Sequence, residues 1–72
     1  MKKEELKEVI LSLLKERNGL TSTEIRDMLI DKGVEFNMIE FREALADLVR
    51  EGKVKKLPNY EKKKFLFYYE KG

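Results

Sequence analysis

The sequence predicts a small α+β fold in which a three-helix core precedes a C-terminal two-stranded β-hairpin. Apolar residues recur at helical spacing up to residue 51, and from there the spacing changes to the alternation of a β-strand. A chain of 72 residues also has room for one domain with a single core. We therefore expect one domain over residues 1–72.

The first helix is expected over about residues 2–17. Its apolar residues follow the i, i+3, i+4, i+7 and i+8 spacing of one helical face. They are Leu6, Val9, Ile10, Leu13 and Leu14. Asn18-Gly19 is a typical helix stop, so the helix should end before it.

Two further helices are predicted by a start signal that occurs twice. Each start has a capping residue, an acidic partner three positions later and an apolar pair around them, which together form a capping box and a hydrophobic staple. These residues are Thr21, Glu24, Leu20 and Ile25 at the first start, and Asn37, Glu40, Phe36 and Phe41 at the second. With Gly33 and Gly52 as stops, the helices should span about residues 22–32 and 38–51. The short link between them predicts a helix-turn-helix, although another three-helix bundle would also fit.

The last segment, about residues 53–70, is expected to form the hairpin. Pro58-Asn59 indicates its turn, and the alternation after it places Phe65, Phe67 and Tyr69 on one face of the second strand. An isolated hairpin is marginal in water. We therefore expect this aromatic face to cover the helical core.

Composition argues against several classes of function. The chain has no Cys and no His, and its Ser and Thr residues stand in no activating pattern, so we expect no enzyme, no cofactor and no metal. The longest apolar run, residues 65–69, is far too short to cross a membrane, and the charged start does not resemble a signal peptide. A cytoplasmic protein is the expectation. The many Lys and Glu residues, with Gln absent, are typical of a thermophile-like composition.

Charge is distributed unevenly along the chain. Residues 1–52 hold nine basic and twelve acidic groups, a net charge of −3, whereas residues 53–72 hold seven lysines and two glutamates, a net charge of +5. Such asymmetry indicates an anionic partner for the C-terminal end. The alternative is that the lysines only keep an aromatic-rich hairpin soluble.

The order of elements, together with the stretch ALADLVREGKV at residues 44–54, resembles the winged-helix family of DNA-binding domains, in particular small archaeal or viral transcriptional regulators. The resemblance assigns Leu45, Leu48, Gly52 and Val54 to core and capping positions. It makes residues 37–51 the recognition helix and residues 55–64 the wing. It implies a regulator that binds double-stranded DNA, with the third helix in the major groove and the basic wing on the phosphate backbone.

The candidate DNA-binding residues come from these two segments. Lysine contacts a phosphate as a point charge, Arg42 could read a guanine edge, and Ile39 and Ala46 could meet thymine methyl groups. Tyr60, at the hairpin tip, could touch sugar or base, or could fold back onto its own hairpin. The full set is Asn37, Ile39, Arg42, Glu43, Ala46, Arg50, Lys53, Lys55, Lys56, Tyr60, Lys62, Lys63 and Lys64.

The acidity of the third helix favours an alternative function. Helical spacing places Glu43 and Asp47 on the face opposite the core, with Glu40 on its flank. Carboxylates near a phosphate backbone are repulsive. The helix could therefore be an ordinary solvated face, or the domain could be a winged-helix module that binds a protein and not DNA.

A homodimer is a further expectation. Leu11 and Ile30 lie off the main apolar stripes, and Leu66 and Tyr68 fill the second face of the hairpin. Clustered on one surface, these four side chains would form a dimer patch, which a regulator of palindromic sites needs.

Overall fold

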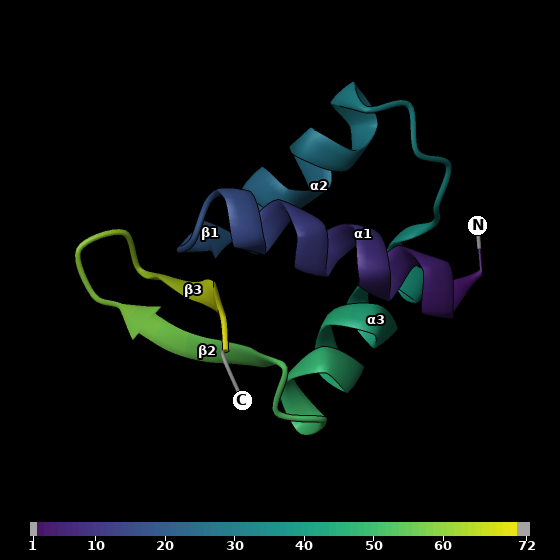
Figure 1. Cartoon of the computed structure of the whole chain (residues 1–72). Helices are drawn as coiled ribbons and strands as arrows, with labels where there is room; N and C mark the ends of the chain where they lie inside the picture. The colour runs from purple at the N-terminus through teal and green to yellow at the C-terminus, as the bar shows by residue number, and fades with distance from the viewer. Residues whose placement is uncertain (1, 71–72) are drawn as a thin grey trace.

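The computed structural model describes residues 2–70 and has an α+β architecture of three helices and a three-stranded antiparallel sheet (Figure 1). This arrangement is compatible with a helix-turn-helix followed by a hairpin. The elements in chain order are α1 (Lys3–Glu16), β1 (Leu20–Thr21), α2 (Ser22–Asp31), α3 (Met38–Arg50), β2 (Val54–Asn59) and β3 (Lys64–Tyr69). Figure 1 shows the loop between β2 and β3 projecting beyond the helices.

The sheet has one strand more than the sequence predicted. Its order is β1-β3-β2, and β1 pairs with β3 through Leu20 opposite Phe67 and Thr21 opposite Leu66. A two-residue strand is too short to show any alternation, and Thr21 is at the same time the cap of α2. The extra strand ties the start of α2 to the hairpin, so these two parts hold a fixed relation to each other.

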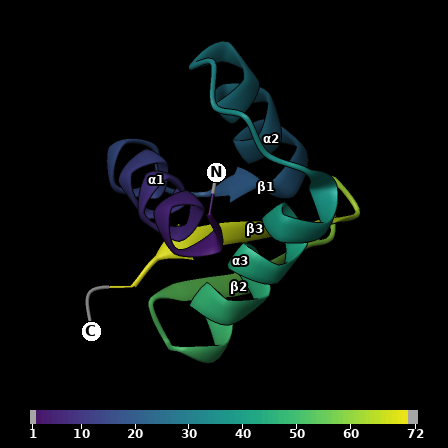
Figure 2. The same ribbon diagram turned by 90° about the vertical axis from the view of Figure 1, so that its right-hand side faces the viewer.

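The core lies between the three helices and one face of the sheet. Helix α1 packs against α3 and β3, and α3 packs against β2 (Figure 2). Ala44, which the sequence analysis did not assign to the core, is fully buried, and Val49 is only partly buried. The buried hydrophobic residues are Leu6, Ile10, Leu13, Leu14, Leu20, Ile25, Leu29, Phe41, Ala44, Leu45, Leu48, Val54 and Phe67.

Both predicted helix starts carry their caps. Thr21 Oγ1 accepts the Glu24 N–H at 3.2 Å, and the Glu24 carboxylate accepts the Thr21 N–H at 3.1 Å, which completes the predicted capping box. At the start of α3, Asn37 Oδ1 accepts the Glu40 N–H at 2.7 Å. Here the reciprocal bond differs from the prediction, because the Glu40 carboxylate accepts from the Asn37 side-chain amide at 3.1 Å.

The predicted apolar staples are present as well. Leu20 and Ile25 are both buried, and the rings of Phe36 and Phe41 lie 5.6 Å apart between centroids. The staples fix the direction from which the chain enters α2 and α3.

The prediction that Pro58-Asn59 forms the hairpin turn is wrong. Both residues lie in β2, where Pro58 is tolerated because β2 is an edge strand. The turn is formed by residues 60–63. Asn59 Oδ1 accepts the Lys62 N–H across it at 3.1 Å, and Lys63 adopts a left-handed φ of 53°.

The aromatic face of β3 covers the core only in part. Phe67 is buried and Tyr69 packs against the core, as predicted, but Phe65 is 49% exposed. Phe65 pairs with Pro58 near the hairpin tip, and its ring lies 4.4 Å from Lys56 Nζ. The tip extends past the helices, so no core remains there for Phe65 to cover (Figure 1).

The four side chains expected to form a dimer patch have different surroundings. Leu11 packs against the core, Ile30 is 58% exposed on α2, and Leu66 and Tyr68 are half-buried on the sheet face opposite Phe67. The Tyr68 ring approaches Gly19, where a Cβ would lie 3.0 Å from the Cε1 atom of the tyrosine.

Among the described residues, no helix is long and apolar enough to span a membrane.

Candidate functional site

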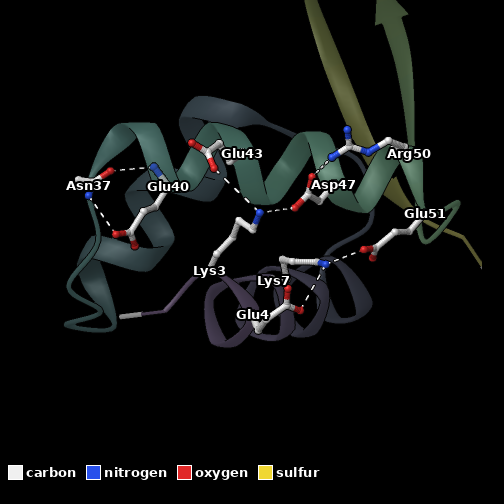
Figure 3. Close-up of polar contacts among 9 residues, drawn as sticks. All are labelled: Lys3, Glu4, Lys7, Asn37, Glu40, Glu43, Asp47, Arg50 and Glu51. Atoms are coloured by element: carbon white, nitrogen blue, oxygen red, sulfur yellow. Dashed lines mark hydrogen bonds and ion pairs between the residues drawn. The ribbon is translucent and has the colours of Figure 1, made fainter.

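The acidic side of α3 faces α1 and is paired with lysines of that helix (Figure 3). Lys3 Nζ lies 2.9 Å from an Asp47 oxygen and 4.0 Å from a Glu43 oxygen. One turn further along α1, Lys7 Nζ lies 2.7 Å from a Glu51 oxygen. The acidic residues at 43, 47 and 51 and the lysines at 3 and 7 recur at four-residue intervals, so each set forms one stripe on its helix.

This pairing corrects the predicted orientation of Asp47. The sequence analysis placed Asp47 on the solvent face of α3, but the residue is 9% exposed and contacts both Lys3 and Arg50. The prediction considered only the core stripe of α3 and could not include the position of α1, which covers the Asp47 side of the helix.

The contact between Lys7 and Glu51 changes the titration of both groups. Hydrogen bonding to Glu51 raises the pKa of Lys7 above 10.5, because the bond stabilises the charged amine. The same bond lowers the pKa of Glu51 below 4.5. Both groups therefore stay charged, and mutually neutralised, across the physiological pH range.

With Glu43 and Asp47 directed at Lys3 of α1 and Glu40 held by Asn37, α3 presents a largely apolar and cationic outer face. Ile39 is 71% exposed, Arg42 and Ala46 are exposed, and the Arg50 side chain is 74% exposed. Residues 42, 46 and 50 follow one another at four-residue intervals and so share a face of the helix. Glu43 is the acidic residue beside them, and its carboxylate is directed at Lys3.

Three adjoining hollows connect this face of α3 with the hairpin. The first, about 420 Å³, lies between α3 and the sheet and is lined in part by Arg42, Arg50 and Lys56. The second, about 300 Å³, shares Lys56 with the first and adds Lys64. The third, about 410 Å³, shares Lys64 with the second and adds Lys62. We call these cations the basic track: Arg42, Arg50, Lys56, Lys62 and Lys64.

The start of α2 lies in the middle of the basic track. Ser22 lines the first two hollows, and Thr21 and Thr23 line the second and third. Free backbone N–H groups and the helix dipole make the first turn of a helix favourable for anions. Ser22 and Thr23 add hydroxyl and backbone N–H donors to a surface that already carries five cations, whereas the Thr21 N–H is bound to the Glu24 carboxylate.

Among the described residues that line the three hollows, Glu24 is the one acid. Its carboxylate is held by the capping box. The hydrogen bond from the Thr21 N–H lowers the pKa of Glu24, and the nearby Lys62 lowers it further. The negative charge of Glu24 is thus directed at the helix start and compensated there, so it opposes an incoming anion only weakly.

The remaining candidate residues lie off the basic track. Lys53 is 3.8 Å from Glu51 and lines a hollow beside α1. Lys55 pairs with Tyr68, so it occupies the opposite sheet face from Lys56. Tyr60, 86% exposed, and Lys63 line a further hollow at the hairpin tip, which borders the basic track at Lys64 but contains none of its other cations. Asn37 is engaged as the cap of α3.

Two groups of residues in this region were missed by the sequence analysis. Ser22 and Thr23 enter the site because β1 draws the start of α2 against the hairpin, and no local signal indicates that strand. Lys3 and Lys7 could have been found, since their four-residue spacing matches that of the acidic stripe on α3.

No group of three or more potential metal-ligating side chains comes together within residues 2–70. Comparison of the chain with protein-family models, with curated proteins and with solved structures gave no match.

Proposed function

We propose that this chain is a winged-helix domain that binds double-stranded DNA and serves as a transcriptional regulator. The observation that carries the proposal is the basic track, which continues from α3 across the start of α2 to the hairpin while the acidic stripe of α3 is paired with α1. The elements that the family uses to contact DNA, the third helix and the wing, thus present their cations on one continuous surface.

The acidity of α3 was the main argument against DNA binding, and the ion pairs weaken that argument. A carboxylate 2.9 Å from an ammonium group has much of its field cancelled at the distance of an incoming phosphate. The outward-facing side chains of α3 are then two arginines and two apolar residues. Ile39 precedes Arg42, and Ala46 lies between Arg42 and Arg50. This combination suits the major groove, where arginine binds guanine and apolar groups contact thymine methyls.

The roles divide according to chemistry. Lys56, Lys62 and Lys64 would contact phosphates, which supplies affinity without sequence information. Arg42, in the first half of α3, would read a base edge.

A homodimer that doubles the site remains part of the proposal. Sedimentation of the protein at micromolar concentration tests it, since a monomer at that concentration would exclude dimerisation through any surface.

A protein-interaction module is the second candidate function. The observation that favours it is the exposure of Met38 and Ile39, 41% and 71%, in the first turn of α3. Apolar side chains at adjacent exposed positions suit a protein partner as well as a base edge.

Fluorescence anisotropy with a labelled mixed-sequence duplex tests the proposal. Regulators of this kind bind such DNA with micromolar or tighter Kd at low salt, and log affinity falls steeply with log salt. Lys64→Ala should weaken binding, whereas Lys32→Ala, which removes the same charge from the far end of α2, should leave it nearly unchanged. Failure to bind any duplex at low salt would favour the protein-interaction module.

Arg42→Ala tests the specificity role. On a site selected from random duplexes, the variant should lose roughly 1–3 kcal/mol of binding free energy, and much less on unselected DNA. Equal losses on both would make Arg42 a phosphate contact.

A further inference from the structure

The hollow between α3 and the sheet has a property that DNA binding does not use. We call it the α3–sheet groove. Its floor is formed by apolar side chains at the edge of the core, of which Leu45 is 6% and Phe67 7% exposed, together with Val49 and Ala46. In the proposed DNA complex Lys56 contacts a phosphate and Arg42 reads a base edge, and neither contact gains from the buried apolar side chains Leu45 and Phe67 beneath them.

Two cations at the rim have no carboxylate partner within the part of the chain that the structure describes. Among residues 2–70, no ion pair joins Arg42 or Lys56 to an acid, and the contact made by Lys56 Nζ is with the Phe65 ring at 4.4 Å. Arg50 pairs with Asp47. Among the described residues no acidic side chain lines the groove: Glu43 and Asp47 of α3 are paired with Lys3 of α1, and Glu40 accepts from Asn37 at the helix start. The rim therefore has positive charge available to an anion.

The size of the groove matches a small molecule. At about 420 Å³ it lies in the range of about 300–1,000 Å³ that is typical of small-ligand sites, which combine apolar walls with a few polar groups that fix orientation. The Ser22 hydroxyl, at the start of α2, is a further polar group at its edge.

We propose that the α3–sheet groove binds a small aromatic carboxylate. The ring lies on the floor of Leu45, Val49 and Phe67, and the carboxylate lies between Arg42 and Lys56. Arginine and carboxylate match geometrically as a bidentate pair, and the apolar floor selects an anion with a flat hydrophobic body over a bare one. Because the same two cations belong to the basic track, the bound carboxylate competes with DNA, and this consequence rests on the proposed function.

The probe is 2-naphthoate, titrated into ¹⁵N-labelled protein without DNA and followed by amide chemical shifts. A ligand with about 13 non-hydrogen atoms should saturate the site with a Kd on the order of 1 mM or tighter. Shifts should concentrate at Ser22, Ala46, Val49 and Lys56. Acetate, which lacks the ring, and 2-naphthamide, which lacks the charge, should each bind at least about tenfold more weakly.

Variants localise the site. Ala46→Trp fills the groove from an exposed position and keeps every cation, so it should abolish binding. If the tryptophan disturbs the fold, the smaller substitution Ala46→Leu replaces it and should weaken binding. Arg42→Ala should weaken binding about tenfold or more, since a charge-assisted bond is lost, while Lys32→Ala should change nothing. Shifts spread over the hairpin lysines, equal binding of 2-naphthamide, or undiminished binding by the folded Ala46→Trp protein would overturn the inference.

The two proposals can fail separately. A protein that binds a duplex but not 2-naphthoate refutes only the groove ligand. A protein that binds 2-naphthoate in the groove but no duplex refutes only the DNA-binding function.

Discussion

The lysines of the hairpin fall into two sets that differ in position and not in charge, which allows a matched experiment. Lys56, Lys62 and Lys64 lie on the basic track, whereas Lys53 and Lys55 lie away from it and Lys63 lines the neighbouring hollow at the hairpin tip. Replacing either set with alanine changes the formal net charge from +2 to −1. If a diffuse positive field were responsible for DNA binding, the two triple variants would behave alike.

The basic track predicts a large difference between them. Each lysine that neutralises a phosphate of B-form DNA contributes about 0.9 to the slope of log affinity against log salt, so three lysines contribute about 2.7. We call the triple variant that lacks Lys56, Lys62 and Lys64 the on-track variant, and the other triple variant the off-track variant. When the salt concentration rises from 50 to 200 mM, the wild type should lose about 40-fold more affinity for DNA than the on-track variant loses. The off-track variant should keep a slope close to that of the wild type.

Anisotropy titrations of both triple variants and the wild type, each at four or more salt concentrations, distinguish DNA binding by the basic track from binding by a diffuse positive field. Melting curves measured in parallel check that the fold is retained. The on-track variant should lose little stability, since the contact of Lys56 with the Phe65 ring is worth only about 0.5–1 kcal/mol at an exposed site. Equal flattening of the slope in both variants would refute the assignment of the track, and an unaltered slope in both would leave the lysines without a role in binding.

Three further predictions concern the fold that carries the site. Thr21→Ala should lower the free energy of unfolding by about 2 kcal/mol and Asn37→Ala by about 0.5–1 kcal/mol, because the Thr21 cap is buried whereas water can replace the exposed Asn37 cap. Urea denaturation compares the two variants, and equal losses of stability would contradict this reasoning. Gly19→Ala should cost more than about 1 kcal/mol, because its φ of +86° and an aromatic ring 3.0 Å from the new Cβ both oppose a side chain, so an unchanged melting temperature would contradict it. The lowered pKa of Glu51, due mainly to the hydrogen bond from Lys7, gives stability that is complete above pH 4.5 and is lost as the pH falls through that lowered pKa. Glu51→Gln should therefore flatten the acid side of the stability curve, and a curve of unchanged steepness would count against this pair.

Local signals in the sequence predicted the helices well. A capping box or a staple involves residues within five positions of each other, so its physical cause lies wholly within the segment that shows it. Thr21, Asn37 and the Phe36–Phe41 pair therefore appear in the structure as the sequence indicates.

The features that sequence patterns did not predict all depend on distant contacts. Strand β1 exists because Leu20 meets Phe67, 47 positions further along the chain. Asp47 faces inward because α1 lies on that side of α3, and Phe65 is exposed because the hairpin outreaches the helices. Of the candidate site, strand alternation alone could have separated Lys55 from Lys56, but their distance from α3 depends on how β2 packs against that helix, which no local pattern shows.

Amide chemical shifts during addition of a mixed-sequence duplex at low salt show directly whether DNA lies against α3 and the basic track. We expect the shifts to concentrate at Arg42, Ala46, Lys56 and Lys64 and to spare Lys32 at the far end of α2. A spectrum that does not change, or shifts confined to the opposite sheet face around Lys55, would contradict it.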